Sequence, residues 1–311
     1  QLMREAAKNG FRTNLYELAI RAVDQMDVAA GTELKNSPGR LVTVALSTSG
    51  SDLIGAELSG RLICWNTSDG TCWPFAGFGE PVAAVVWSPA GRRLAATSAG
   101  HTWTCRVNSA ERTVEDVRAV RSREALASFS PDGNQLALWG ETLGVWDFGL
   151  GQFLWERPSP RIEGGGTTGP LYRAVAWSPD GRMLAAVPRD EATIEFWSMP
   201  TGEPLLPIGV VDIESALTQV GPPIEAIAFS PDGSRIACGC ADGTIRVFNR
   251  NTAVLEHTLR GHEGSVRWLS YSAPGGWLFS ADTREVRMWD LERAIHPGVI
   301  VRSTSDLASC A

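Results

Sequence analysis

The sequence predicts an all-β protein built from six copies of one repeat, and three observations carry this prediction. A phrase of alternating apolar residues followed by a turn recurs along the 311 residues. Three copies contain Ser-Pro-Asp-Gly, a turn in which proline presets φ and glycine accepts a positive φ. The copies start 41, 42, 48, 52 and 42 residues apart, close to the roughly 40–45 residues of a four-stranded β-propeller blade. They are 41–50, 82–91, 124–133, 172–181, 224–233 and 266–275.

Each repeat continues in the same way after its turn. A second apolar strand follows, and a third strand then ends in an aromatic residue in five of the repeats. In the second repeat Arg106 stands at the expected distance and replaces the aromatic residue. A nearly constant distance with variable residues is typical of stacked structural repeats. The aromatic residues are Trp65, Trp146, Trp197, Phe248 and Trp289.

The repeat resembles the WD40 repeat. The resemblance spans residues 41–302 and rests on Trp146-Asp147, Trp289-Asp290, Gly261-His262 and the Ser-Pro-Asp-Gly turns. It implies a WD40-type β-propeller, and in the last blade it implies a structural hydrogen-bond network of His262, Ser280, Asp282 and Trp289. Only that blade has a Gly-His pair before its first strand. Periplasmic propellers of the TolB kind share the Ser-Pro-Asp-Gly turn but lack the Trp-Asp and Gly-His marks.

Blade number and domain boundaries follow from the same repeats. Counting first strands gives six blades, whereas seven would need a strand from residues 28–40 or from sequence upstream of Gln1. Apolar residues at helical spacing, with Asn14 and Glu17 as a capping box, predict an α-helix over about 15–27. We therefore expect three parts: an N-terminal helical segment and linker (1–40), the propeller (41–303) and a C-terminal tail (304–311).

Composition argues against several classes of partner. The net charge of −7 and the pI near 5.3 argue against nucleic acid, because phosphate binding depends on clustered Lys and Arg. No apolar run approaches the roughly 18–20 residues of a membrane span. The six cysteines form no C-x-x-C pair, so we expect no metal, free buried thiols and an intracellular, cytoplasmic location. The chain begins with Gln1 and not Met, which is consistent with a fragment or a processed product.

Signatures of catalysis are absent from the sequence. There is no G-x-S-x-G, H-E-x-x-H or P-loop motif. Residues 164–169 match G-x-G-x-x-G, but this motif binds dinucleotides only between a strand and a helix of a parallel sheet. We therefore expect neither enzymatic activity nor a cofactor.

The sequence predicts a non-catalytic protein–protein interaction scaffold within a multiprotein complex. Repeat-equivalent positions at the start of the first strands differ between repeats, namely Val42, Ala83, Ala125, Arg173, Glu225 and Arg267. Such positions give a rigid ring a varied surface. We expect contacts with partner proteins at Arg173, Arg189, Glu225, Glu263 and Arg267.

Other interpretations stay open at this level. The helix before the repeats is similar to the arrangement in STAND-type signalling ATPases, in which the propeller is a sensor. A propeller can also bind a small molecule or catalyse a reaction in its central channel. The long connections 157–170 and 207–223 are recognition loops or tolerated insertions.

Overall fold

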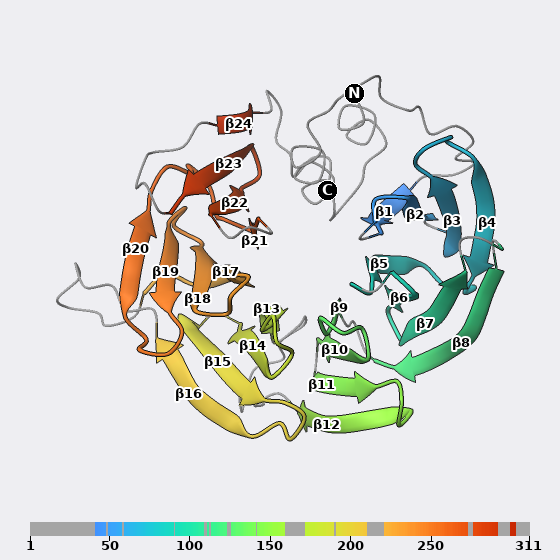
Figure 1. Cartoon of the computed structure of the whole chain (residues 1–311), viewed down its shortest axis with the longest axis horizontal. Coiled ribbons are helices and arrows are strands. Elements are labelled where there is room, and N and C mark those ends of the chain that lie inside the picture. The colour runs from blue at the N-terminus through green and yellow to red at the C-terminus, as the bar shows by residue number, and fades with distance from the viewer. Residues whose placement is uncertain are drawn as a thin grey trace. The chain divides into compact units, whose positions relative to one another are not determined.

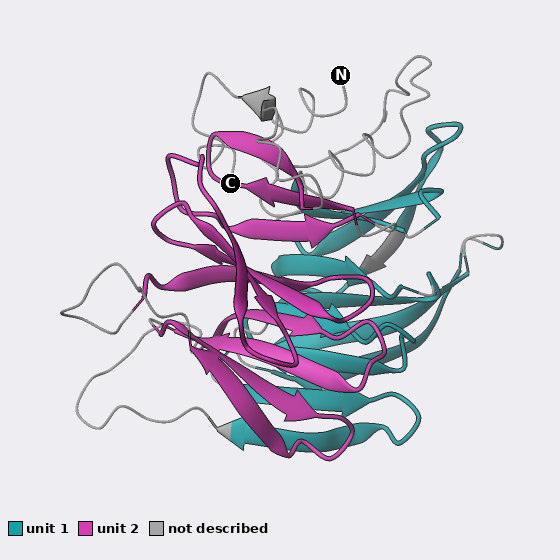
Figure 2. Ribbon diagram, turned by 60° about the vertical axis from the view of Figure 1, so that its left-hand side comes forward, with its two compact units in different colours: residues 1–169, 309–311 teal, residues 170–308 magenta. Residues whose placement is uncertain are grey.

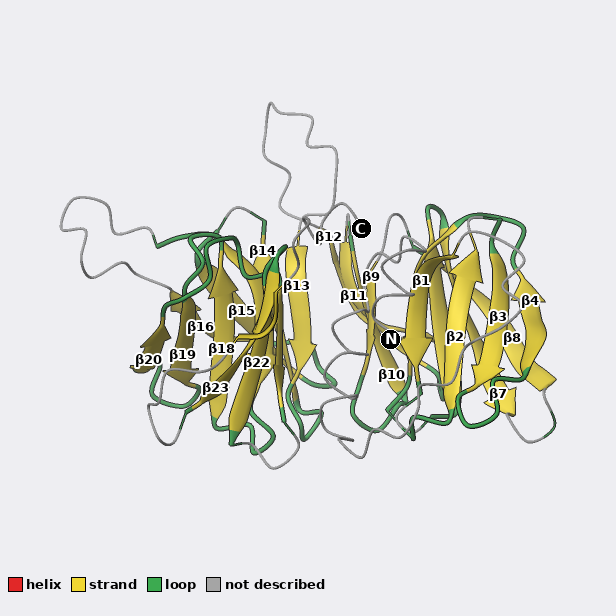
Figure 3. Cartoon of the chain, turned by 90° about the horizontal axis from the view of Figure 1, so that it is seen from above, coloured by secondary structure: helices red, strands yellow, loops and turns green. Residues whose placement is uncertain are grey.

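The computed structural model describes most of the repeat region. It covers residues 41–302 except 48, 58, 90, 109–110, 112, 123–125, 141, 159–171, 190, 210–220, 273–275 and 292–298. The expected helix over 15–27, the tail 304–311 and most of the two long connections therefore lie outside the described residues. Figure 3 draws strands and loops in the described part. Among the same residues, no helix has the length and apolar character needed to cross a membrane.

The described strands form six antiparallel sheets of four strands each, and the chain divides into two compact units (Figure 2). Unit 1, which contains residues 1–169, holds three of the sheets. The first is β1 (Leu41–Leu46), β2 (Asp52–Glu57), β3 (Arg61–Asn66) and β4 (Cys72–Gly77). The second is β5 (Val82–Trp87), β6 (Arg93–Ser98), β7 (His101–Asn108) and β8 (Thr113–Arg121). The third is β9 (Leu126–Phe129), β10 (Gln135–Trp139), β11 (Thr142–Asp147) and β12 (Gln152–Pro158).

Unit 2, residues 170–308, holds the other three sheets (Figure 1). The fourth sheet is β13 (Tyr172–Trp177), β14 (Met183–Pro188), β15 (Thr193–Ser198) and β16 (Pro204–Gly209). The fifth is β17 (Ile224–Phe229), β18 (Arg235–Cys240), β19 (Ile245–Asn249) and β20 (Leu255–Leu259). The sixth is β21 (Trp268–Tyr271), β22 (Trp277–Ala281), β23 (Glu285–Asp290) and β24 (Val299–Arg302). The strands of every sheet follow chain order, so the predicted all-β fold with one four-stranded sheet per repeat is confirmed.

The Ser-Pro-Asp-Gly turns join the first and second strands and fix their register. In the fifth sheet Ser230 Oγ donates to Asp232 Oδ1 and accepts from the backbone N of Arg235 at 2.9 Å. The hydrogen bonds from Ser230 and Ser234 lower the pKa of Asp232 to about 2. Gly233 takes the positive φ of 71° that the turn needs. The same bonds recur at Ser130 to Gln135 and at Ser178 to Met183.

The second strand of each sheet is buried on both faces over most of its length, and the second sheet shows which neighbours within its unit cover the two faces. In β6, Ala96 belongs to an apolar cluster with Ile54 and Leu62 of the first sheet. The preceding residue, Ala95, packs with Leu136 of the third sheet. Successive residues of a strand face opposite sides of the sheet. The second strands therefore read as continuous apolar runs and not as apolar–polar alternation.

The register corrects the predicted position of the missing aromatic residue. Leu53 pairs with Trp65 and Leu278 with Trp289, and the equivalent pair in the second sheet is Leu94 with Cys105. Cys105, and not Arg106, therefore takes the aromatic position, where burial raises the pKa of its thiol to about 12. The distance along the chain from the first strand gave Arg106 because the connection between the second and third strands differs in length between sheets. Register depends on that connection.

Two glycines with positive φ test how closely the turns pack. Gly243 has a φ of 81°, and a Cβ there would lie 2.6 Å from the carbonyl oxygen of His262, whereas Gly233 has its nearest neighbour at 3.6 Å. We expect Gly233→Ala to lower the free energy of unfolding by about 1 kcal/mol, and Gly243→Ala by at least about 1 kcal/mol more. Urea unfolding measures both, and equal losses would contradict the close approach at Gly243.

Candidate functional site

The sixth sheet contains a buried chain of polar contacts. Trp289 Nε1 donates to Ser280 Oγ at 2.7 Å, and Ser280 Oγ lies 2.7 Å from His262 Nε2. His262 Nδ1 lies 3.0 Å from Asp282 Oδ2. Ser280 lies in β22 and Trp289 in β23, while His262 and Asp282 lie in the connections before β21 and after β22. The structure thus brings together the four residues of the network that the resemblance implies.

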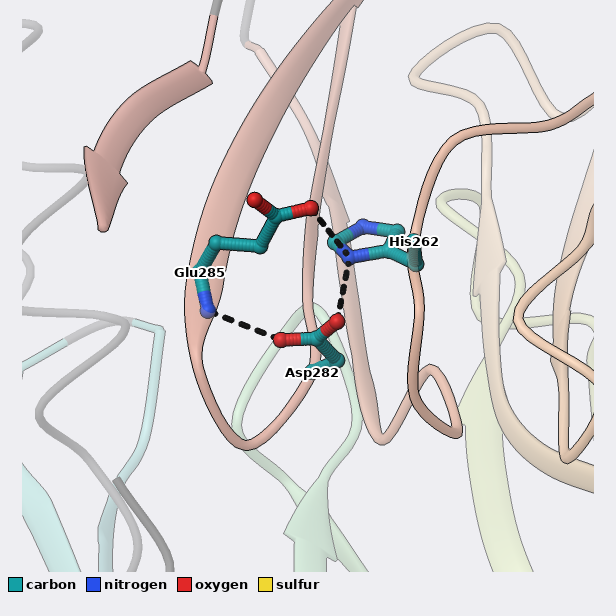
Figure 4. A group of neighbouring side chains, drawn as sticks. All are labelled: His262, Asp282 and Glu285. Carbon is teal, nitrogen blue, oxygen red and sulfur yellow. Dashed lines mark hydrogen bonds and ion pairs between the residues drawn. The ribbon is translucent and has the colours of Figure 1, made fainter. Parts of the chain in front are cut away.

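The donors and acceptors of this chain identify the tautomer of His262. The indole N–H of Trp289 can only donate, so Ser280 Oγ accepts from it and donates its own hydrogen to Nε2 of His262. Nδ1 then carries the imidazole proton. Nδ1 lies 3.0 Å from Asp282 Oδ2 and 3.7 Å from Glu285 Oε1, and dashed lines mark both contacts in Figure 4.

Burial decides the charge of this network. It lowers the pKa of His262, although the nearby carboxylate of Asp282 acts in the opposite direction. Burial alone would raise the pKa of Asp282, but backbone N–H groups of Arg284 and Glu285, which donate to Oδ1 at 2.7 and 2.8 Å, outweigh it and lower this pKa. A neutral imidazole therefore faces an ionised aspartate at neutral pH.

His262, Asp282 and Glu285 also offer ligand atoms within 4.8 Å of one another, the spacing that a metal ion would need (Figure 4). These atoms already have partners. Both oxygens of Asp282 face N–H groups, and Glu285 Oε1 accepts from Arg287 Nε. A cation would have to displace these bonds and the proton on Nδ1. The arrangement is therefore complete as a hydrogen-bonded network and is not a preformed ligand set.

Ser280, His262 and Asp282 follow one another in the order of a nucleophile, a base and an orienting acid. Catalysis would require the hydroxyl of Ser280 to reach a substrate. Ser280 is fully buried at 0% exposure, and its oxygen already accepts the indole N–H of Trp289. The three residues therefore stabilise the sheet and have no access to a reactant.

Arg173 and Glu225, two of the predicted partner-binding residues, contact each other between neighbouring sheets. Arg173 Nη1 lies 2.8 Å from Glu225 Oε2, with 31% and 17% of the two side chains exposed. Each lies in a β-bulge, since pairing steps from Tyr172 to Ala174 in β13 and from Ile224 to Ala226 in β17. Val42 and Ala83 occupy the same bulge in β1 and β5. A bulge redirects the side chain of the residue that it contains. The sequence could not show these bulges, because they depend on how the strands pair.

The structure places the remaining predicted residues at the ends of other strands and in connections. Arg267 is exposed, and its backbone N donates to Ala281 O at 2.9 Å. Glu263 is 71% exposed, and its Oε2 lies 3.7 Å from Arg284 Nη1. Arg189 follows β14 and is half-buried, with contacts of its own. The sequence analysis did not predict Arg284 as a contact of Glu263. Its position in the turn after Asp282 was the one feature that could have suggested it.

Comparison with known proteins identifies the repeat. The family profile described as WD domain, G-beta repeat, matches residues 215–249 and 253–290. The second match runs from the start of β20 to the end of β23. This match is therefore offset from the sheet, since it takes the last strand of one sheet and three strands of the next, whereas the first match takes in β17 to β19.

Curated relatives match this chain over part of their length. Protein groucho of Drosophila melanogaster is 29% identical over 120 residues, which is 38% of this chain and 15% of groucho. The WD repeat-containing protein VIP3 of Arabidopsis thaliana is 30% identical over 102 residues, 32% of each chain. Nuclear distribution protein PAC1 of Arthroderma benhamiae is 30% identical over 196 residues, 57% of this chain and 40% of PAC1. The chain thus spans less than half of each of these relatives.

Removal of the Ser280 hydroxyl tests the network. Ser280→Ala leaves the indole N–H of Trp289 and Nε2 of His262 buried without a partner, so we expect the free energy of unfolding to fall by about 2 kcal/mol or more. Ser270→Ala is the control, because Ser270 Oγ makes only a 3.4 Å contact with Tyr271 O, and it should cost less than about 0.5 kcal/mol. Urea unfolding of both variants decides, and similar losses would count against the network.

The lowered pKa of His262 predicts a pH dependence of stability. The unfolded chain binds a proton at this histidine below about pH 6.5, whereas the folded protein binds it only at lower pH. The stabilisation is therefore complete above about pH 6.5 and is lost as the pH falls towards the folded pKa. We expect the loss in unfolding free energy between pH 7.5 and 5.5 to be smaller in His262→Gln than in the parent protein. The same slope in both proteins would contradict a neutral His262.

Proposed function

Because this chain is a WD-repeat protein, we propose that it is a non-catalytic scaffold that binds other proteins within a multiprotein complex. One observation carries this proposal: the same backbone bulge recurs in four of the described sheets and presents residues of different chemistry. The residue at this position is apolar in β1 and β5, basic in β13 and acidic in β17. Such a surface varies in charge while its framework stays constant, which suits recognition of a partner.

The ion pair of Arg173 and Glu225 prepares part of this surface for binding. Both side chains are more than half buried and 2.8 Å apart, so a partner loses little side-chain entropy when it contacts them. Arg267 complements the pair as an exposed cation, and among the described residues no carboxylate forms an ion pair with it. Arginine is common at the energetic centres of interfaces.

Relatives and thiols support the rest of the proposal. The names of groucho, VIP3 and PAC1 state no catalysed reaction, and PAC1 is called a nuclear distribution protein. Five cysteines of the described region are free, four of them buried: Cys64, Cys72, Cys105, Cys238 and Cys240. Free cysteines fit a reducing compartment, and we place the protein in the cytoplasm.

Charge reversal tests the scaffold surface. The first variant, Arg267→Glu, reverses the exposed cation, and the second, Arg173→Glu with Glu225→Arg, keeps the ion pair but exchanges its ends. Arg182→Glu is the matched control, since Arg182 is exposed at the other strand ends of the same sheet as Arg173. Proteins captured from an extract of the source cells are compared by mass spectrometry, after circular dichroism has shown equal folding.

We expect at least one partner to be depleted about tenfold or more, equivalent to 1.4 kcal/mol, in both test variants and retained by Arg182→Glu. Identical capture by all four proteins would move the binding surface away from these residues. Capture of nothing by the parent protein would contradict the scaffold proposal itself.

A further inference from the structure

Three arginines converge on one aspartate in unit 1. Asp116 of β8 lies 2.7 Å from Arg118 Nε, 3.7 Å from Arg93 Nη1 and 3.9 Å from Arg106 Nε. The arginines come from three strands, β6, β7 and β8, and so converge on one face of the second sheet. Three positive charges and one negative charge leave an excess of two positive charges on these four side chains.

Strand pairing makes this cluster costly. Arg93 of β6 and Arg106 of β7 are direct cross-strand partners, and like charges opposite each other destabilise a sheet. Repulsion from Arg106 adds to burial in lowering the pKa of Arg93. Asp116 also takes a positive φ of 51°, which is uncommon outside glycine. Two unfavourable features therefore occur together here, the pairing of like charges and the positive φ of Asp116, and such features are common at functional sites.

The other sheets show what the fold alone requires at this position. Their third strand places a short polar residue there, and in three sheets its side chain accepts a backbone N–H of the following turn, as Asn66 does from Ser68 at 2.9 Å. In the second sheet this role moves two residues on, to Asn108, which accepts from Glu111 N at 3.2 Å. Arg106 is therefore not needed for the turn. The equivalent pairs are Asp52–Asn66, Gln135–Asp147, Met183–Ser198, Arg235–Asn249 and Trp277–Asp290.

The cluster combines one fixed arginine with two accessible ones. The guanidinium of Arg93 lies 4.3 Å from the ring centre of Phe148 in the third sheet, and its side chain is only 14% exposed. Arg106 and Arg118 are 56% and 45% exposed. One exposed apolar residue lies near the cluster: Leu150, 64% exposed, precedes Gly151, where a Cβ would lie 3.5 Å from Arg118 Nη1.

We propose that Arg93, Arg106 and Arg118 bind a phosphate group on a phosphorylated serine or threonine of a partner polypeptide. A phosphate monoester carries a charge of about −1.5 to −2 at pH 7. The three arginines outnumber the carboxylates beside them, which are Asp116 and Glu115, the cross-strand partner of Arg106, so the phosphate would meet a net positive site. The planar guanidinium binds phosphate with two parallel hydrogen bonds. The exposed Leu150 favours a peptide over a free ion, because a peptide supplies apolar side chains next to the phosphate. None of these residues belongs to the proposed scaffold surface, so either proposal can fail alone.

Titration of the whole chain with defined peptides tests this site. The probe is a short Gly/Ala peptide that carries one phosphoserine next to a leucine, and it is compared with its unphosphorylated twin, an aspartate analogue and inorganic phosphate. The Nε–Hε resonance of Arg93, which contacts Asp116 and is kept in every variant, reports binding by NMR. The test variant is Arg106→Ala with Arg118→Ala, and the matched control is Arg92→Ala with Arg121→Ala, which removes the same charge from exposed positions outside the cluster.

We expect saturable shifts with the phosphopeptide, weakened about tenfold or more in the test variant and less than about twofold in the control. Equal affinity for the aspartate analogue would overturn the choice of phosphate. Equal affinity for inorganic phosphate would assign the site to a free ion. An equal loss of affinity in the control variant would show that overall positive charge, and not this cluster, binds the peptide. Absence of binding by the parent would overturn the proposal.

The thermal midpoint of Arg106→Asn separates a binding role from a structural one. Asparagine or aspartate occupies this position in four of the other sheets, and the substitution removes the repulsion with Arg93. We expect a Tm equal to or higher than that of the parent, together with weaker binding of the phosphopeptide. A lower Tm would show that Arg106 supports the fold and would contradict the costly-cluster argument.

Discussion

Burial of both faces of a four-stranded sheet is the constraint on which the rest of the structure depends. Backbone hydrogen bonds are satisfied within each sheet, so the sheets of a unit are held together mainly by apolar side chains. Ala95 and Ala96 show the consequence, because adjacent residues pack against different neighbouring sheets. The middle of a second strand such as β14 has no free face. Chemical variation is therefore left to strand ends, connections and outer strands.

Polar residues that lie in or near the interior behave differently in the sixth and the second sheet. In the sixth sheet, Trp289, Ser280, His262 and Asp282 satisfy one another, and burial keeps the imidazole neutral. The network replaces apolar packing with directional bonds and leaves nothing for a ligand. In the second sheet the arginines around Asp116 are left with an excess of charge. A completed network indicates a structural role, and an uncompensated one indicates a missing partner.

Two surfaces thus follow from one repeated framework. The bulges of Arg173 and Glu225 lie near the start of their first strands, whereas Arg93 begins a second strand and Arg106 lies near the end of a third. Both surfaces use positions near strand ends, where the residue differs between sheets. A scaffold with separate surfaces can hold one partner through shape and charge and another through a modification.

The sequence by itself predicted one four-stranded sheet per repeat, the chain order of the strands and the turns, because these depend on short-range apolar patterns and on Ser-Pro-Asp-Gly chemistry that acts within a few residues. It left six or seven sheets open. It also placed His262, Ser280, Asp282 and Trp289 together through resemblance. Only the tertiary structure decided that Cys105 and not Arg106 takes the aromatic position, that Arg173 and Glu225 lie in bulges, and that three arginines meet at Asp116. Register, bulges and contacts between sheets depend on hydrogen bonds between residues far apart in the chain, and a one-residue change in a connection alters them without changing the local pattern.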